Sequence, residues 1–569
     1  MWNPFDVLLV NPKNPTTGGG NDTAFTSENL ALAYLSAALQ QHGANVLIID
    51  CDLDQLSGED ISKLVQQHRP CFVGLTALAR NADEAIDIAC SIRRTCPEVP
   101  IVLGGLHFTY CGEQVMREIA DITYVIRGEG EISISSLYCY LKHGSGCERD
   151  IGGLIYRDST GSLKQAPMQP AIENLDKLPN PDRQVLRRAL DNGLQPAIPM
   201  LGSRGCYARC LFCNASKVYV EGGGSSWRHR SPENIVDEMA MLIETYGVGA
   251  DPVILFYDDS FIGPGSLGRK YANALANEML ARQQNVMFET FLRADSFHDD
   301  YVLIAKLRKA GMVRTFMGIE APDDQELKLF RKGVTSKQIA GALDNLARNH
   351  VLTPSSGFIM FLPYSTFEML KRNAEYLRSI GQASIWNLST RLDVYAGNEF
   401  VKKLEEMGLI TGSKLHGGLF TYRFQDERVG AFADFIDISE HKLAQRLDAC
   451  SRFIEFNYHS ISYEITQIAG GDKFNKPEEI QQTLTQIQES AYHFFMDSLE
   501  AFRDGSTDKD LIKLKTIFLK NISSLIDELE GSYGSFLLRI NNILSSGIFN
   551  PDSQIPSNGK LKDDGCCHA

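Results

Sequence analysis

The chain has 569 residues, of which 43% are hydrophobic and 22% charged, values typical of folded globular proteins. This length predicts about two to four domains, and the net charge of −15 argues against a nucleic-acid backbone or an anionic membrane surface as partner. No apolar run approaches the ~20 residues of a spanning helix, and no basic flank marks a signal peptide at the N-terminus. Thirteen cysteines at irregular spacing suit a reducing compartment. We therefore expect a cytoplasmic protein without a membrane span.

Residues 1–150 alternate β-rich runs with helical patterns. Strands are predicted over residues 6–12, 45–52, 71–78, 100–108 and 122–131. Helices are predicted over residues 27–43, 58–68, 82–95 and 112–119, the first of them capped by Ser27 and ended by Gly43. Continuous Val, Ile and Leu runs between helices indicate a Rossmann-like parallel sheet covered on both faces. Ligands of such sheets bind beyond the carboxyl ends of the strands, where this chain has glycine-rich loops.

The rest of the chain predicts four further segments and an α/β multidomain fold overall. Residues 151–195 are irregular and read as a linker. Six β/α units predict a partial (β/α)6 barrel over residues 196–420, with strands over 197–203, 252–261, 286–295, 312–321, 353–363 and 383–397. Residues 421–549 predict a helical C-terminal domain, because apolar residues recur there at helical spacing over 477–502 and 510–547. Residues 550–569 are polar and predict a flexible tail.

Three cysteines, Cys206, Cys210 and Cys213, follow the first strand of the barrel in a CxxxCxxC spacing. Thiolates so close in sequence can converge on one metal centre. A structural zinc ion needs a fourth ligand, and the nearest candidate, His229, lies in a basic stretch that suits a surface or linker. An iron–sulfur cubane with three cysteine ligands leaves one iron open to another ligand. The spacing therefore favours a [4Fe-4S] cluster.

Around this motif the chain resembles the radical S-adenosylmethionine (SAM) superfamily. Segments YDDSFI (257–262), FLRADSF (291–297), GIEA (318–321) and FRKGVTSKQI (330–339) resemble family segments in the same order. The resemblance implies that SAM binds the open iron and is cleaved reductively to a 5′-deoxyadenosyl radical. It implies SAM contacts from five residues: Phe212, Asp258, Arg293, Gly318 and Glu320.

One departure from the family follows the fifth predicted strand. Relatives usually have a Gly-x-Pro-Gly turn there, whereas this chain has Phe361, Leu362, Pro363 and Tyr364. We expect the bulkier turn to reshape the rim of the cofactor pocket or to contact the substrate.

The domain order also resembles the class B enzymes of this superfamily, which carry an N-terminal cobalamin-binding domain. The chain lacks an Asp-x-His-x-x-Gly loop, so the resemblance implies cobalamin without a histidine lower ligand, above the loop at residues 76–81. The implied cobalamin-binding residues are Thr76, Leu78, Arg80, Gly104, Gly105, His107, Gly128, Glu129 and Gly130. Leu78 or Arg80 is expected nearest the cobalt, and His107 at a turn or at the corrin edge. A domain that kept the fold and lost the ligand remains the alternative.

The resemblance implies methylation of an unactivated carbon or a phosphinate phosphorus through methylcobalamin. It implies a small-molecule or peptide substrate and an electron donor such as flavodoxin or ferredoxin. Tyr364, Arg391 and Asp393 lie near predicted barrel mouths and are the catalytic candidates. Cyclisation, ring contraction, 3-amino-3-carboxypropyl transfer and a non-catalytic iron–sulfur redox sensor remain alternatives. Cys566, Cys567 and His568 either bind thiophilic metals or return electrons to a site, or form an inert tail.

Overall fold

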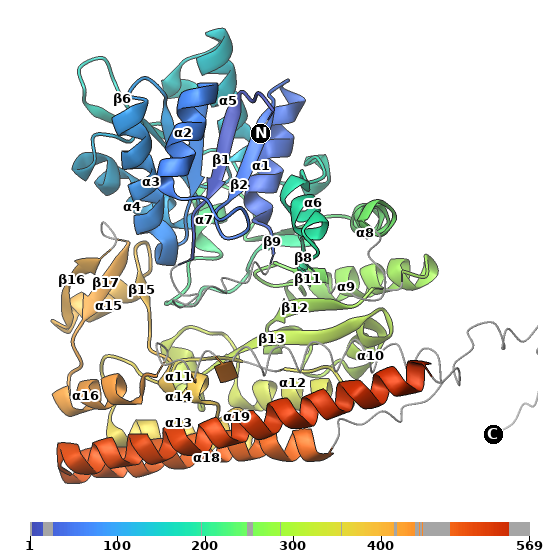
Figure 1. The fold of residues 1–569 in the computed structure, drawn as a ribbon, viewed down its shortest axis with the longest axis vertical. Coiled ribbons are helices and arrows are strands. Elements are labelled where there is room, and N and C mark those ends of the chain that lie inside the picture. The colour runs from blue at the N-terminus through green and yellow to red at the C-terminus, as the bar shows by residue number, and fades with distance from the viewer. Residues whose placement is uncertain are drawn as a thin grey trace, which may run out of the picture.

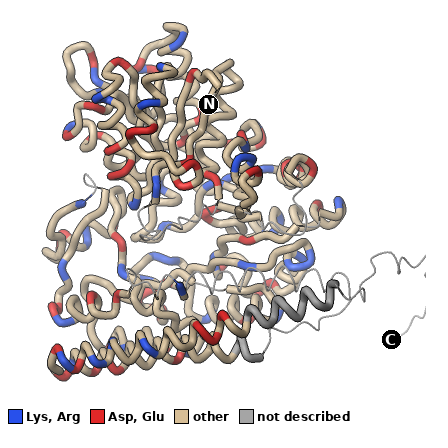
Figure 2. The backbone as a smooth tube through the Cα atoms, viewed as in Figure 1, with Lys and Arg blue, Asp and Glu red and all other residues tan. Residues whose placement is uncertain are grey.

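The computed structural model describes residues 3–14, 27–194, 196–246, 254–284, 286–353, 356–414, 418–438, 443, 446–447 and 478–545, with side chains in the last range from 482 to 532. An N-terminal sheet domain lies above a central parallel sheet, and two long C-terminal helices lie below it (Figure 1). The expected tail over 550–569, with Cys566, Cys567 and His568, lies outside the described residues. In the described part of the chain, no helix is long and apolar enough to cross a membrane. Acidic and basic residues are interspersed along it (Figure 2).

The N-terminal sheet has seven strands in the order β2-β1-β3-β4-β5-β6-β7. The strands are β1 (Val7–Asn11), β2 (Val46–Asp50), β3 (Phe72–Thr76), β4 (Ile101–Gly104), β5 (Tyr124–Ile126), β6 (Leu154–Arg157) and β7 (Leu163–Gln165). The first five are parallel, and β6 and β7 pair antiparallel at one edge. The helices are α1 (Leu30–Gln41), α2 (Gly58–His68), α3 (Ala82–Thr95), α4 (Leu106–Glu118) and α5 (Glu131–His143). One apolar cluster packs α2, α3 and α4 on one face, and another packs α1 and α5 on the other, which confirms the predicted parallel-sheet domain.

Three local predictions in this region are wrong. Helix α1 is capped by Asn29 rather than Ser27, because the Asn29 side chain accepts from Leu32 N. The strand expected to reach residue 108 ends at Gly104, because Gly105 adopts φ +92° and α4 begins directly after it. The presumed linker over 151–195 contains β6, β7 and α6 (Gln184–Asp191), so part of it completes the sheet.

The central sheet contains five parallel strands in the order β14-β13-β12-β11-β8. They are β8 (Ile198–Met200), β11 (Ile254–Phe256), β12 (Phe288–Leu292), β13 (Met312–Glu320) and β14 (Ser356–Phe358). The helices around them are α8 (Pro232–Tyr246), α9 (Gly265–Ala281), α10 (Tyr301–Lys309), α11 (Asp324–Leu329), α12 (Ser336–Arg348) and α13 (Phe367–Ser379). After β8, an antiparallel hairpin of β9 (Ser203–Gly205) and β10 (Trp227–His229) encloses the cysteine segment and the short α7 (Lys217–Glu221).

The predicted sixth barrel strand over 383–397 does not form. This stretch contains α14 (Ile385–Ser389), and only an isolated parallel bridge between Phe361 and Arg391 stands where a sixth strand would pair. The chain then continues into a small antiparallel sheet of β15 (Val394–Tyr395), β17 (Leu419–Tyr422) and β16 (Ile410–Lys414), with α15 (Phe400–Glu406) between β15 and β16. Polar residues follow each short apolar run here, so the segment pairs with its hairpin neighbour instead of extending the buried sheet.

The C-terminal part is helical, as predicted, with α16 (Glu427–Ile436), α18 (Glu478–Asp504) and α19 (Asp508–Ser545). Its buried side chains belong to the same apolar cluster as those of the central sheet. Phe361 and Leu362 are fully buried, and the Phe361 ring packs on Phe432 and Phe495. The expectation that this bulky turn reshapes the cofactor rim is therefore wrong for Phe361, which joins the barrel to the C-terminal helices.

Candidate active site

The carboxyl edges of the two parallel sheets face each other, as contacts from two N-terminal loops and from α4 show. The Ser27 and Tyr257 hydroxyl oxygens lie 3.1 Å apart, and the Arg80 guanidinium lies within electrostatic range of the Tyr395 hydroxyl. From α4, the Tyr110 ring packs so closely on Gly397 that a Cβ there would collide with it. Because ligands of parallel sheets bind at these edges, the junction is the candidate active site.

The cysteine loop lies at this junction because of the β9–β10 hairpin. Gly205 adopts φ +87°, and a Cβ there would collide with the Ser226 carbonyl oxygen, so only glycine lets the hairpin close directly before Cys206. Cys213 N donates to Cys210 O at 3.2 Å, and Leu211 N donates to the Phe330 carbonyl oxygen at 2.9 Å. These bonds fix the loop as one compact turn against the end of α11.

The three thiols lie near one another, because Cys210 acts on the pKa of Cys206, and both Cys206 and Cys210 act on the pKa of Cys213. Burial raises the pKa of Cys206, and Cys210 acts in the same direction. Cys206 is buried, Cys210 is half-buried and Cys213 opens to solvent. Arg293 Nη1 lies 3.8 Å from Cys210 Sγ. Thiolates in this partly buried loop need a neighbouring positive charge or a metal to stabilise them.

The donor set fits a cluster better than a single ion. Within the described residues, no group of three or more Cys, His, Asp or Glu side chains converges tightly enough to hold one metal ion. A cubane separates its thiolate ligands more widely, because each thiolate binds a different iron. Three cysteines are the number of protein ligands that a cubane with one open iron uses, so the [4Fe-4S] assignment rests on the cysteine motif.

A buried network extends from the cysteine loop along the strand ends. Arg293 also donates to the Lys332 carbonyl oxygen at 2.6 Å, and the Lys332 ammonium lies 2.9 Å from Glu320 Oε1. Glu320 adopts φ +69°, a conformation that costs about 1–2 kcal/mol in a residue with a Cβ. A Cβ on Gly318 would collide with Glu320 Oε1, so the glycine leaves room for this pair. Three of the predicted SAM contacts, Arg293, Gly318 and Glu320, thus lie together at the strand ends beside the cysteine loop.

The other two predicted SAM contacts have different surroundings. The Phe212 ring lies edge-on to Phe330 at 5.6 Å beside the cysteine loop. Asp258 is fully buried and accepts from Gly202 N and the Ser203 hydroxyl, both at 2.8 Å. Its carboxyl group is therefore engaged within the protein, and its expected contact with SAM stays a prediction.

Sequence reasoning missed the neighbour, Asp259. Its side chain is exposed, accepts from Gly205 N at 3.2 Å and acts electrostatically on both Cys206 and Cys213. Successive side chains of a strand point to opposite faces. Asp259 therefore faces the barrel lumen, as Tyr257 does, whereas Asp258 faces the packed layer. This alternation could have identified Asp259 from the sequence.

The barrel lumen carries an aromatic row directly below this level. The β11–β12–β13 register places Tyr257, Phe291 and Phe316 side by side. Their ring centroids are 6.5 and 5.6 Å apart, and Tyr257 and Phe316 remain 46% and 38% exposed. Two residues further down these strands, on the same face, Glu289 and Arg314 pair across the floor. The lumen therefore has an exposed apolar surface between the cysteine loop and the Glu289–Arg314 ion pair, whose two charges neutralise each other.

On the N-terminal side, the loop after β3 reaches into the junction. Leu78 is 48% exposed, and its backbone N donates to Asn81 Oδ1 at 2.9 Å, which fixes the turn. Arg80 is exposed beside it. Gly105 packs on this loop, since a Cβ there would lie 2.7 Å from Thr76 Oγ1; Gly104 precedes it at the end of β4. The side chains at this edge are thus an apolar Leu78 and a cationic Arg80.

The remaining predicted cobalamin residues are partly engaged elsewhere. His107 is buried, packs edge-on to Phe108 and would collide with a Cβ on Gly418. Glu129 pairs with Arg204 and Arg228 and accepts from Ile172 N, and its expected contact with cobalamin stays a prediction. Gly128, at φ +79°, donates to Thr109 Oγ1, and Gly130 begins α5 against Leu35.

The structure separates the three catalytic candidates. Asp393 is exposed and accepts from the Tyr395 hydroxyl at 2.8 Å, on the segment that faces Arg80. Arg391 pairs instead with Asp434 of α16 at 2.8 Å. Tyr364 is half-buried beneath the Lys403 ammonium. Asp393 thus has a contact at the junction, and the catalytic roles of Tyr364, Arg391 and Asp393 stay predictions.

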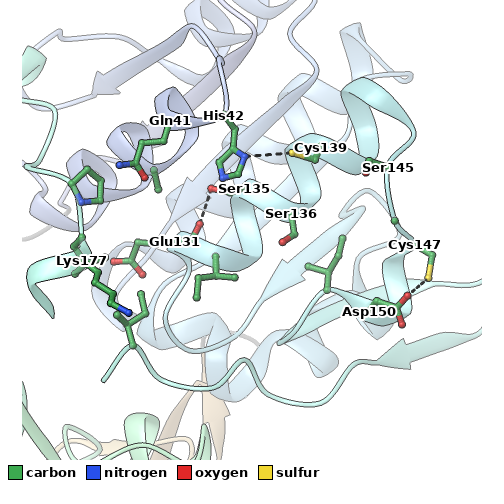
Figure 3. A pocket seen from close by; sticks show the side chains of 17 residues that line it. Gln41, His42, Glu131, Ser135, Ser136, Cys139, Ser145, Cys147, Asp150 and Lys177 are labelled. Carbon is green, nitrogen blue, oxygen red and sulfur yellow. Dashed lines mark hydrogen bonds between the residues drawn. The ribbon is translucent and has the colours of Figure 1, made fainter. Parts of the chain in front are cut away.

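A further pocket lies elsewhere, between α1, α5 and the segment after β7 (Figure 3). It is lined by Gln41, His42, Glu131, Ser135, Cys139, Cys147, Asp150 and Lys177, among others. Cys139 Sγ lies 3.7 Å from His42 Nδ1, and Cys147 donates to Asp150 (Figure 3). None of the three clustered cysteines reaches it, so we place the active site by chemistry at the junction rather than in this pocket.

Comparisons with known proteins agree with this geometry. The B12 binding domain family matches residues 18–137, and the radical SAM superfamily matches residues 200–377. The chain belongs to the radical SAM superfamily and carries a B12-binding domain. It is therefore a radical SAM enzyme, whose two domains imply cobalamin, SAM and a [4Fe-4S] cluster.

Relatives of this radical SAM enzyme include an uncharacterized methyltransferase of Pyrococcus horikoshii, 29% identical over 66% of this chain and 78% of the relative. The anaerobic magnesium-protoporphyrin IX monomethyl ester cyclase of Rubrivivax gelatinosus is 27% identical over 65% of each chain. Among solved structures, the cobalamin-dependent radical enzyme OxsB, with aqua-cobalamin and SAM bound, has the same fold: the TM-score is 0.69 at 19% identity, over 96% of this chain and 82% of OxsB.

Proposed function

We propose that the enzyme is a cobalamin-dependent methyltransferase that acts on an unactivated carbon or a phosphinate phosphorus of a small molecule. The observation that carries the proposal is the face-to-face placement of two carboxyl edges, one with the cysteine loop and one with the Leu78 loop. A carbon without an acidic proton offers no nucleophile, so acid–base chemistry cannot methylate it. A radical source and a methyl carrier on opposite sides of one substrate meet that need.

In this assignment residues 1–150, extended by β6 and β7, form the cobalamin domain, and residues 196–420 form the SAM domain. The cluster would be held by Cys206, Cys210 and Cys213, and SAM by Phe212, Arg293, Gly318 and Glu320. When bound, the cluster supplies the electron that cleaves SAM. The chain itself orients these ligands: Arg293 donates toward Cys210, and the Glu320–Lys332 pair fixes the strand end. Asp258 holds the strand before the loop.

We propose that cobalamin binds as methylcobalamin without a protein ligand on its lower face. Leu78 supports this, because its exposed aliphatic side chain has no donor atom. His107 is packed between Phe108 and Gly418. The Arg80 guanidinium carries hydrogen-bond donors only and has no lone pair to offer a metal.

The lumen supports a substrate with an apolar body. Tyr257, Phe291 and Phe316 would contact it over their exposed faces, and aromatic faces favour flat or hydrocarbon groups. Asp393 and Tyr395 would contact the part nearest the N-terminal domain. Reduction of the cluster would come from a donor such as flavodoxin or ferredoxin, in the reducing cytosol that suits the free cysteines of the described chain.

The test uses protein reconstituted anaerobically with iron, sulfide and hydroxocobalamin. Corrin absorption that persists through gel filtration is expected, as is formation of deuterated methylcobalamin when SAM labelled with CD₃ is added to the reduced protein. Loss of all corrin on the column would overturn the assignment. Corrin retention without any label transfer, with SAM cleavage intact, would favour a cyclisation like that named for the R. gelatinosus relative.

A further inference from the structure

The hairpin that carries the first cluster cysteine brings two arginines face to face. The antiparallel register pairs Arg204 of β9 with Arg228 of β10. Both side chains are buried, and Arg204 stands two residues before Cys206. Like charges directly opposite each other destabilise a strand pair, and burial removes the water that would screen them. The hairpin therefore needs an anion between these guanidinium groups.

Glu129 of the N-terminal domain supplies that anion. Its Oε1 lies 2.7 Å from Arg204 Nη1 and 3.0 Å from Arg228 Nη2, and its Oε2 lies 3.0 Å from Arg228 Nη1. Ile172 N donates to Oε2 at 2.8 Å, so both oxygens are fully used. Although burial opposes its charged form, the two arginines keep the pKa of Glu129 below its ordinary value.

Further groups from the N-terminal domain complete the contact. Glu131 lies 2.5 Å from Arg204 Nη2, and the Arg204 guanidinium lies 5.5 Å from the ring of Tyr34. Glu131 Oε2 is buried without a hydrogen bond, so Glu131 binds Arg204 less completely than Glu129 does. Glu129 belongs to the loop that follows β5 and Glu131 is the first residue of α5, both at the carboxyl edge of the predicted cobalamin domain.

The geometry points to a positioning link: Glu129, through Arg204 and Arg228, couples cobalamin binding in the N-terminal domain to the conformation of the cluster loop. This inference rests on the proposed function. Corrin binding orders the strand-end loops, the loop after β5 fixes Glu129, and Glu129 fixes the hairpin that precedes Cys206. Since coupling between two sites is reciprocal, assembly of the cluster strengthens cobalamin binding by the same factor.

A second buried network provides a matched control. Arg183 pairs with Glu28 of the N-terminal domain at 2.5 Å and with Glu238 of α8 at 2.7 Å, and Glu238 also pairs with Arg230. This network likewise crosses between the domains and is likewise buried. It does not include the residues of the cysteine loop or the Arg204–Arg228 pair. Arg230 follows β10 and its backbone N donates to the Gly202 carbonyl oxygen at 2.9 Å, so this network reaches the base of the hairpin only through Glu238 and Arg230. Glu28→Gln therefore removes one buried interdomain charge that is held by Arg183 and Leu186 N rather than by Arg204 or Arg228.

The experiment measures the affinity of the full chain for hydroxocobalamin with and without the reconstituted cluster, in wild type, Glu129→Gln and Glu28→Gln. Couplings between protein sites are typically 5–150-fold, so we expect the cluster to tighten wild-type binding about tenfold. For Glu129→Gln we expect the hydroxocobalamin affinities with and without the cluster to differ by no more than about twofold. For Glu28→Gln we expect the same ratio of the two affinities as in wild type. The electron paramagnetic resonance (EPR) spectrum of the reduced cluster should change on cobalamin addition in wild type and Glu28→Gln only.

Equal loss of coupling in Glu28→Gln would overturn the inference, since the effect would then be general domain docking. Full coupling in Glu129→Gln, or tight cobalamin binding by wild type without coupling, would also overturn it while leaving the proposed function intact. No binding by wild type would contradict both. If Glu129→Gln does not fold, Glu131→Gln replaces it and should show an intermediate ratio; an unchanged ratio there would overturn the link.

Discussion

The rings of Phe361 and Phe495 lie 6.2 Å apart, which joins the turn after β14 to the middle of α18. Phe432 of α16 packs on both, at 5.7 and 5.1 Å, and all three are fully buried. Where the family usually has a glycine turn, this chain thus has Phe361, whose ring packs against the C-terminal helices α16 and α18. The barrel and these helices share one core and should unfold together.

Phe361→Ala should therefore destabilise the whole lower half of the molecule. Removing a fully buried phenylalanine costs about 3–5 kcal/mol through lost burial and a cavity. Urea unfolding followed by circular dichroism should show the loss as a lower midpoint for a single combined transition of barrel and helices. Phe316→Ala, at an exposed lumen position, should leave the midpoint nearly unchanged. An early separate loss of helix, with the barrel signal intact, would contradict the shared core.

Gly318→Ala should weaken SAM binding while the cluster still assembles. The added methyl would collide with Glu320 Oε1 and stand 2.6 Å from Lys332 Nζ, so the buried pair must move. EPR spectra of the reduced protein should show normal cluster content without the change that SAM causes in wild type. Gly357→Ala is the matched control, because its nearest contact to Glu320 is 3.2 Å and needs only a small shift. A normal SAM-induced change in Gly318→Ala would contradict this placement.

Asp258 should make the cluster-free protein less stable as the pH rises from 6 to 8. Burial raises the pKa of this carboxyl to about 7, so the folded state holds a proton that the unfolded chain has already released at pH 6. Deprotonation then lowers the free energy of unfolding by about 1 kcal/mol across this window. Thermal unfolding at several pH values should show the decline in wild type and a flatter profile in Asp258→Asn. An identical slope in both proteins would refute the assignment.

Leu78→His should create a lower ligand if cobalamin binds above this loop. In wild type, the cob(II)alamin EPR spectrum should lack splitting from an axial nitrogen, because Leu78 has no donor atom. The variant should gain that splitting as the imidazole reaches the cobalt. Leu106→His, at another exposed position of the same edge, is the control and should not. The same spectrum in Leu78→His and wild type would place the corrin elsewhere.

Much of the fold could be predicted because buried strands and helices have regular patterns of apolar residues in the sequence. The runs at 45–52 and 71–78 predicted β2 and β3 correctly, since strands covered on both faces are continuously apolar. The helical spacing around Phe495 predicted α18. The cysteine motif was visible because its residues are adjacent in the sequence. The stretch 383–397 was misread because its short apolar runs suit a strand and a helix equally well.

Side-chain roles at the junction could not be predicted, because they depend on partners far away in the sequence. Glu129 meets Arg204 across 75 residues and Arg228 across 99, so its glycine-rich surroundings suggested a ligand loop. Asp258 and Asp259 are neighbours with opposite orientations, and only the structure shows which one turns inward. Arg391 was placed at the barrel mouth because its partner, Asp434, lies in a helix whose packing the sequence did not reveal.

The most direct test of the central claim is reductive cleavage of SAM by the anaerobically reconstituted protein. Wild type should release 5′-deoxyadenosine in the presence of dithionite, and Cys206→Ala, Cys210→Ala and Cys213→Ala should each abolish release together with the cluster's EPR signal. Cys71→Ala, a half-buried cysteine of the N-terminal domain, should retain both. Absence of 5′-deoxyadenosine from wild type with a fully assembled cluster would contradict a radical SAM enzyme built around this loop.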